Sequence, residues 1–239
     1  MIITKTPFRI SFFGGGTDYP DWYKENGGAV LSTTIDKYCY ISTRYLPPFF
    51  DCKYRIRYTE KEEVQSVDEI KHSKVRECLK FLKIEKGIEM VHASDIPAMS
   101  GMGSSSAFTV GFLHSLYALL GKIVPKQKLA LDAIHVEQER AKENVGSQDQ
   151  FAVAFGGLNR IDFNGNHKIS VTPITIKSNR LNELQNKLMI FFTGFPRTAS
   201  EIAAEQIKNI PFKHKELKKL HELVDAATEV LNNESKLLD

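Results

Sequence analysis

The chain of 239 residues lacks the features that mark several classes of protein. Its three cysteines, Cys39, Cys52 and Cys78, are odd in number and have no pair at metal-ligand spacing. With 15 glycines and 9 prolines, the composition is unlike that of a collagen or a disordered chain. No apolar run reaches the roughly 18 residues that cross a membrane. We therefore expect a globular protein with reduced, buried thiols and no membrane partner.

The balance of charges and the amino-terminal sequence also indicate the class of protein. The net charge is +3, from 32 basic and 29 acidic residues that are interspersed, which gives little support to a nucleic-acid partner. The first residues, MIITKTPFRISFF, enter strand-like sequence without a charged leader or cleavage site, which predicts a cytoplasmic protein. A compact chain of 27.1 kDa hides roughly 70% of its extended-chain surface. The protein can therefore build its own core.

Hydrophobic periodicity and turn residues predict an α+β chain without internal repeats. A helix is expected from near Ser104 to Gly121, followed by a loop that carries Gly146 and Asp149. Thr198 and Glu201 have the spacing of a capping box for a helix that ends near residue 209. The other predicted strands are 8–13, 29–35, 38–46, 53–59, 87–94, a hairpin of 158–163 and 167–174 around Asn164-Gly165, and 187–192; the other helices are 73–83, 126–142 and 213–232.

The segment IPAMSGMGSSSAFTVGFLHSL, residues 96–116, carries the strongest chemical signal. Glycines and small hydroxyl residues lie between a strand and the amino terminus of a helix, where backbone amides and the helix dipole favour an anion. Phosphate is the natural ligand, although a Walker-type loop would need a lysine after Gly103, where serines follow. A serine N-cap with a tight turn is the simpler alternative for this loop alone.

Two further stretches contain candidate functional residues. Asp149 lies in ENVGSQDQFAVAFGG, downstream of Glu137 and Glu139, and phosphoryl transfer needs one carboxylate near the acceptor and another for magnesium. In TPFRISFFGGGTDYP, residues 6–20, a cation precedes three glycines, and Asp18 can accept two sugar hydroxyl hydrogen bonds. A helix cap, and a β-bulge with an Asx turn, would explain the same residues without function.

Together and in this order, these stretches resemble the GHMP kinase superfamily over residues 1 to about 210. Its first motif is Pro-x-Arg/Lys followed by glycines and Thr-Asp. In this sequence it corresponds to Pro7-Phe8-Arg9, followed by the Gly-Thr-Asp-Tyr of residues 16–19. Its second, Pro-x-x-x-Gly-Leu-Gly-Ser-Ser, reads 97–105, with Met102 in the leucine position. The resemblance implies a two-lobe α+β kinase fold, with an amino-terminal lobe like the second domain of ribosomal protein S5 and a ferredoxin-like carboxyl-terminal lobe.

The resemblance also implies roles for individual residues, with ATP and Mg²⁺ as the cofactors. Asp149 would be the catalytic carboxylate, with Arg9 beside it, and Ser105 would bind magnesium. Glu137 is the expected second magnesium ligand, and Glu139 is the competing choice. Nucleotide-binding residues would be Pro97, Gly101, Met102, Gly103, Ser104, Ser105 and Ser106; substrate-binding residues would be Gly16, Thr17, Asp18, Tyr19 and Arg197.

Within the superfamily, FRISFFGGGTDYP, VGSQDQFAVAFGG and TGFPRTAS look most like bacterial kinases of D-glycero-D-manno-heptose 7-phosphate, which act on the anomeric hydroxyl. Arg197 would hold the substrate's phosphate, or it is a solvated arginine beside a capping threonine. A fucokinase-like enzyme for an unphosphorylated sugar is the close alternative. A binding module of the same fold is another, although it would have no use for a magnesium ligand together with a base.

One departure from the family concerns the carboxyl-terminal part. The superfamily's third motif, a second glycine-rich loop, has no counterpart, and no glycine follows Arg197. We therefore expect residues 1–180 to form the ATP-binding domain and residues 181–239 to begin a truncated substrate lobe.

Overall fold

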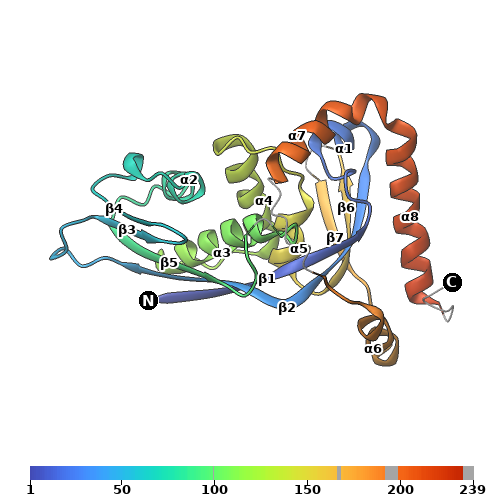
Figure 1. The fold of residues 1–239 in the computed structure, drawn as a ribbon, viewed down its shortest axis with the longest axis horizontal. Coiled ribbons are helices and arrows are strands. Elements are labelled where there is room, and N and C mark those ends of the chain that lie inside the picture. Colours follow the sequence, from blue (N-terminus) through green and yellow to red (C-terminus); the bar gives the residue numbers. More distant parts are fainter. Residues whose placement is uncertain (99, 166–167, 192–198, 234–239) are drawn as a thin grey trace.

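The computed structural model describes residues 1–239 except 99, 166–167, 192–198 and 234–239. Arg197 and Thr198 therefore lie outside the described residues, as does the side chain of Glu201. One seven-stranded sheet carries helices on both of its faces (Figure 1). Its strands are β1 (Ile2–Phe13), β2 (Gly28–Tyr45), β3 (Tyr54–Arg57), β4 (Lys61–Val64), β5 (Ile88–Ser94), β6 (Leu158–Asn164) and β7 (Lys168–Pro173).

The helices are interspersed among these strands, and α6 to α8 follow the last of them. They are α1 (Pro20–Asn26), α2 (Ser73–Phe81), α3 (Ser104–Leu119), α4 (Lys126–Ile134), α5 (Gln148–Phe155), α6 (Ser178–Lys187), α7 (Ala199–Asn209) and α8 (His214–Asn232). A π-helical turn, His135–Arg140, continues α4, and short 3₁₀ turns occupy Val67–Glu69 and Ile210–Phe212. No helix among the described residues is long and apolar enough to cross a membrane.

Strand β2 is the organising element of the sheet. It pairs with β1 along one edge and, along the other, with β5 at its carboxyl end and β6 at its amino end. The predicted strands 29–35 and 38–46 are therefore one strand, and the prediction of a break between them was wrong. Asp36 and Lys37 resemble turn residues because they are exposed, yet they lie mid-strand at the point where the second partner changes.

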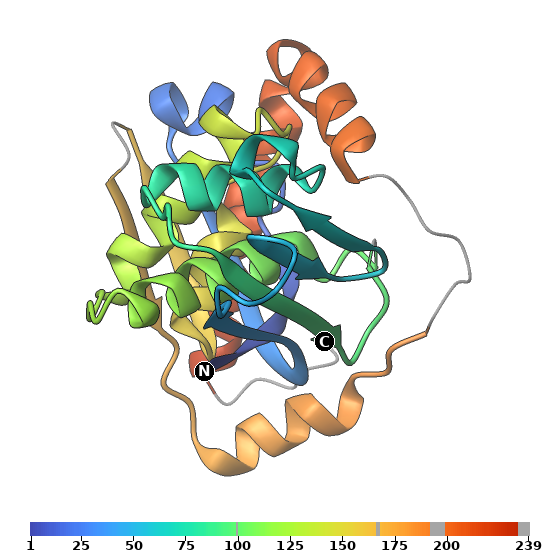
Figure 2. The ribbon, with the colours of Figure 1, turned by 90° about the vertical axis from the view of Figure 1, so that its left-hand side faces the viewer.

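The two faces of the sheet are covered by different helices. Helices α2 to α5 lie on one face, over a core that includes Ile41, Met90 and Phe112. Helix α8 packs on the opposite face, where Val224 contacts the cluster of Ala29 and Leu31 (Figure 1). Since successive strand residues point to opposite faces, the amino end of β2 is buried on both sides. Helix α6 lies at the edge of the fold and buries no residue (Figures 1 and 2). It contacts the rest through Leu184 and a hydrogen bond from Arg180 to the carbonyl of Val230.

Two more local predictions need correction. Residues 188–191 form no strand, and Met189, Ile190 and Phe191 are 79%, 63% and 75% exposed. An apolar run becomes a strand only when another strand supplies backbone hydrogen bonds, and none of the described residues does so here. Asp149 was predicted in a loop but lies in the first turn of α5, where an acidic side chain suits the helix dipole. The helices predicted at 73–83, near 104–121 and 213–232, and the 158–174 hairpin, are confirmed.

Candidate active site

Arg9 and Asp149 form an ion pair, although 140 residues separate them in the chain. The guanidinium Nε and one terminal nitrogen both lie 2.7 Å from Oδ1 of Asp149. The other terminal nitrogen donates to the carbonyl of Gly101 at 2.9 Å. Among the residues that the structure describes, none donates a hydrogen bond to Oδ2 of Asp149. This oxygen is therefore free to accept a proton from a bound ligand.

The serine loop is held against the same strand. The backbone amide of Arg9 donates to the carbonyl of Met102 at 3.1 Å. Gly103 is the N-cap of α3 and has a φ of +72°, and a Cβ there would lie 3.1 Å from Arg9 and 3.4 Å from Oδ2 of Asp149. Glycine is needed at this position both for its φ and for the close approach of the ion pair. The loop, Arg9 and Asp149 thus meet at the amino terminus of α3.

Glu137 lies in the π-helical turn and is completely buried. Its Oε1 accepts from Thr109 Oγ1 at 2.6 Å and from Lys74 Nζ at 3.3 Å. Its Oε2 accepts from Ser106 Oγ at 2.9 Å and from the side-chain amide of Gln150. Glu139, the competing candidate, points outward, is 63% exposed and pairs with His135 at 2.8 Å. Of the two glutamates, only Glu137 faces the serine loop.

Lys74 and Glu143 also belong to this cluster, and the sequence reasoning missed both. Lys74 Nζ donates to Ser105 Oγ and to Glu143 Oε2, the latter at 2.8 Å. Burial lowers the pKa of Lys74, but Glu137 and Glu143 more than offset this, so that its pKa is raised. One signal was present, because Lys74 falls on the buried face of α2 with Val75. A buried charge on such a face needs a partner of opposite sign.

The triple-glycine turn is built around Thr17 and Asp18. Thr17 is fully buried, and its hydroxyl bonds the carbonyls of Gly14 and Ala29 at 2.8 and 3.0 Å, so it shapes the turn and does not face a cavity. Asp18 accepts from the backbone amides of Gly16 and Gln148 at 3.0 and 3.2 Å. Burial and the charge of Asp149 raise the pKa of Asp18. Asp18 thereby ties the turn to the start of the helix that carries Asp149.

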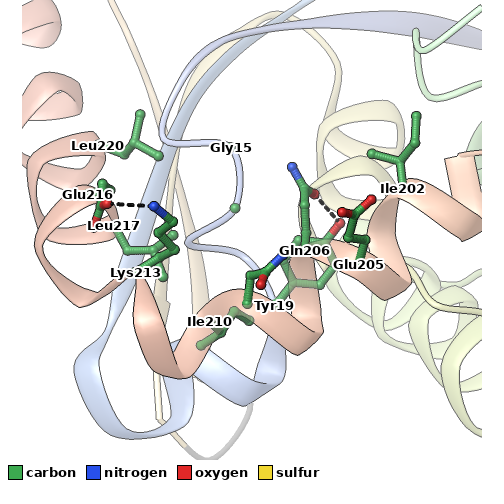
Figure 3. A pocket seen from close by; sticks show the side chains of 12 residues that line it. Gly15, Tyr19, Ile202, Glu205, Gln206, Ile210, Lys213, Glu216, Leu217 and Leu220 are labelled. Carbon is green, nitrogen blue, oxygen red and sulfur yellow. Dashed lines mark hydrogen bonds and ion pairs between the residues drawn. The ribbon is translucent and has the colours of Figure 1, made fainter.

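Two neighbouring cavities lie beside this turn. One, of about 490 Å³, is lined by Arg9, Asp18 and Met102. The other, of about 330 Å³, lies between the turn and α7 (Figure 3). Tyr19 and Gln206 border both cavities and are joined by a hydrogen bond of 3.0 Å from the phenol to the amide oxygen. The predicted residues Gly16, Asp18 and Tyr19 thus come together, with a contribution from α7 that the sequence did not reveal.

Comparison with known proteins identifies the family. Residues 72–157, which include α2, the serine loop, Glu137 and Asp149, match the model of the GHMP kinases N terminal domain. The chain belongs to the GHMP kinase superfamily. Its fold also matches this superfamily, as the resemblance of the motifs predicted. A crystal structure of a D-glycero-D-manno-heptose 1-phosphate kinase from Bacteriodes thetaiotaomicron superposes with a TM-score of 0.72 at 24% identity, over 92% of this chain and 74% of that one.

Two curated relatives are sugar kinases of the same superfamily. The D-glycero-alpha-D-manno-heptose 7-phosphate kinase of Campylobacter jejuni is 30% identical over 84% of this chain. A galactokinase of Roseiflexus is 27% identical over 65% of it. The present chain spans 62% of the length of the first relative and 40% of the second.

A third cavity of the chain, of about 510 Å³, opens on the other side of the serine loop. Lys74, Ser105 and Glu143 line one part of it, and aromatic rings line another. His72 stacks on Phe108 with the ring centroids 4.9 Å apart. Burial, followed by the charge of Lys74, lowers the pKa of His72 to about 4. The cavity therefore combines a neutral aromatic surface with a cationic, hydroxyl-rich end.

The donor atoms around Lys74 suit magnesium. Mg²⁺ is usually held by one or two carboxylates, with substrate phosphates and water completing the octahedron. Ser105 Oγ, Glu137 Oε1 and Glu143 Oε2 are such hard oxygen donors, and all three contact one ammonium nitrogen. These residues therefore fit the ion chemically, and the position between them already holds one cation, the ammonium of Lys74.

Proposed function

We propose that this chain is the nucleotide-binding and catalytic part of an ATP-dependent sugar kinase. The proposed acceptor is the anomeric hydroxyl of D-glycero-D-manno-heptose 7-phosphate, which would become the 1,7-bisphosphate, a precursor of GDP-heptose for surface polysaccharides. The name of the Campylobacter relative supports the heptose, and the galactokinase supports a sugar acceptor more generally. Residues 1–180 would bind the nucleotide, residues 181–239 would begin the substrate lobe, and the enzyme would act in the cytoplasm.

The observation that carries the proposal is the ion pair beside the amino terminus of α3. Oδ2 of Asp149 would accept the proton of the anomeric hydroxyl while that oxygen bonds the γ-phosphorus. The bond from phosphorus to the bridging oxygen breaks at the same time, and ADP leaves without a covalent enzyme intermediate. Arg9, whose guanidinium is held 2.7 Å from Oδ1, would keep the carboxylate in place and stabilise the negative charge that develops.

The predicted binding residues have distinct tasks in this scheme. The nucleotide would occupy the 510 Å³ cavity, with its phosphates on the loop from Pro97 through residues 101–106. Ser105 and Glu137 would hold Mg²⁺, which supplies a positive charge that offsets the charge on the transferred phosphoryl group. The sugar would occupy the cavity beside Arg9, bordered by Gly16, Asp18 and Tyr19. Thr17 would maintain the turn.

The test is phosphoryl transfer from ATP to heptose 7-phosphate, fucose, galactose, mannose and mevalonate, assayed in the natural full-length protein. We expect turnover of heptose 7-phosphate, with transfer to fucose alone pointing to the fucokinase-like alternative. Asp149→Asn should lower kcat by about 10²–10⁴-fold and leave AMP-PNP binding intact.

Asp162→Asn is a matched control, because Asp162 also pairs with an arginine and its side chain is also 25% exposed. Full activity in Asp149→Asn would show that Asp149 is not the catalytic base. Thermal stabilisation by RNA, with none by ATP and Mg²⁺, would favour the binding-module alternative over the kinase.

A further inference from the structure

The ammonium of Lys74 lies at the position where the magnesium ion of the proposed kinase would bind. Its Nζ contacts Ser105 Oγ, lies 3.3 Å from Glu137 Oε1 and 2.8 Å from Glu143 Oε2, and its side chain is only 7% exposed. Ser105 and Glu137 are the two proposed magnesium ligands. The same three oxygens can therefore surround the ammonium or a metal ion, but not both.

Glu137 has no acceptor position left for a metal while Lys74 is in place. A carboxylate has about four lone-pair positions, and four side chains donate to this one. Ser106 and Thr109 are short side chains fixed on α3, and Gln150 is fully buried on α5. Lys74 alone has a long, flexible chain, which can move its ammonium by several ångströms without moving the backbone.

Glu143 can keep an ion pair with the ammonium of Lys74 after it is displaced from Ser105 and Glu137. Its side chain is 26% exposed and borders the 510 Å³ cavity, whereas Glu137 is fully buried. The backbone amide of Glu143 donates to the carbonyl of Glu137 at 2.9 Å, just after Lys142, whose φ is +55°. Lys74 can therefore leave Ser105 and Glu137, keep its contact with Glu143, and face the cavity.

We propose that Lys74 is a placeholder cation. In the nucleotide-free protein it occupies the space between the oxygens of Ser105, Glu137 and Glu143 and balances the charge of the two carboxylates, and it leaves Ser105 and Glu137 when a magnesium nucleotide binds. This inference rests on the proposed function. It implies that the metal alone binds weakly, because it must displace a cation from the same oxygens. Metal that arrives with a nucleotide brings phosphates, and these can accept the displaced ammonium.

The role of Lys74 is tested directly by titrating Mn²⁺ into the nucleotide-free protein. Binding is measured as the loss of the EPR signal of free Mn²⁺. We expect Lys74→Met to bind Mn²⁺ at least tenfold more tightly than the unaltered protein. Lys80→Met is the matched control, since it removes another lysine of α2 that pairs with a carboxylate, Asp68, and it should bind Mn²⁺ as the unaltered protein does. The double variant Lys74→Met/Glu137→Gln should lose the gain. Equal Mn²⁺ affinity in Lys74→Met and the unaltered protein would overturn the proposal.

A second measurement covers the case in which Lys74→Met does not fold in metal-free buffer, because it leaves Glu137 buried without its cation. Millimolar MnCl₂ should then restore its thermal transition, whereas the double variant should fold without metal. If the double variant folds and Lys74→Met stays unfolded in MnCl₂, no cation replaces the ammonium and the proposal fails. Calorimetry of Mg²⁺ with AMP-PNP on the unaltered protein separates the two proposals. Absence of binding there refutes the kinase, and the Mn²⁺ result still decides the role of Lys74.

Discussion

Replacing Thr109 with valine would remove one of the four donors to the Glu137 carboxylate while keeping the shape of the side chain. The hydroxyl lies 2.6 Å from Oε1, and both residues are completely buried. A hydrogen bond to a charged group contributes about 1.5–3 kcal/mol, against about 1 kcal/mol for a neutral pair. We expect Thr109→Val to lower the free energy of unfolding by roughly 2 kcal/mol. In a chain of this size, that loss lowers Tm by roughly 4–8 °C.

Thr43→Val is the matched control for this measurement. Thr43 is also fully buried, but its hydroxyl lies 2.9 Å from the neutral hydroxyl of Ser115. Ser115 already donates to the carbonyl of Phe112 at 2.8 Å, so Thr43 is the donor of this pair. Its loss should cost about 1 kcal/mol. Urea denaturation measures the free energy of unfolding of each variant, and the values can be compared when the m values of the variants are equal. A cost for Thr43→Val equal to or above that of Thr109→Val would refute the view that Glu137 is a charged acceptor.

Two further predictions concern the third cavity. The pKa of His72 is lowered from 6.5 to about 4, so the unfolded chain binds its proton first and stability falls as the pH decreases through that range. His72→Asn keeps an N-cap acceptor for α2 and should flatten the profile of unfolding free energy between these pH values; an unchanged slope would contradict this assignment. Ser105→Ala should weaken Mg²⁺-AMP-PNP binding about tenfold, a loss near 1.4 kcal/mol, without affecting AMP-PNP in EDTA. Calorimetry checks this, with Ser178→Ala, an exposed serine at the first position of α6, as the control. Unchanged affinity in Ser105→Ala would show that Ser105 is not a magnesium ligand.

The parts of the site that sequence could predict are those encoded in short, contiguous motifs. Glycines before a helix, with serines at its first positions, already predict a loop suited to an anion, because the backbone amides and the dipole are local properties. The motifs also singled out Arg9 and Asp149, which the structure brings into contact. That Glu137, and not Glu139, faces the serine loop could be seen only in the structure, since in sequence both lie upstream of Asp149 at similar distances.

The parts that sequence could not predict depend on distant segments. Lys74 and Ser105 are separated by 31 residues and Tyr19 and Gln206 by 187, and neither pair has a local signature. The continuity of β2 was missed for a related reason. Asp36 and Lys37 have the composition of a turn and fall at a register shift with β1, but the residues on either side of them pair with β1, β5 and β6, so the strand continues. Partners supplied from elsewhere in the chain override such weak local preferences.

The pairing of β2 also has a consequence during protein synthesis. Its amino-terminal half, beginning at Gly28, pairs with a strand that ends at Asn164, so this edge stays open while the intervening residues are made. At about 5–20 residues per second, the delay after Tyr45 is roughly 6–24 seconds. Through that interval Ala29, Val30 and Leu31, all buried in the finished protein, lie on an unpaired edge of a nascent chain. The strand that later joins both halves of the sheet thus keeps an open edge until its last partner has been made.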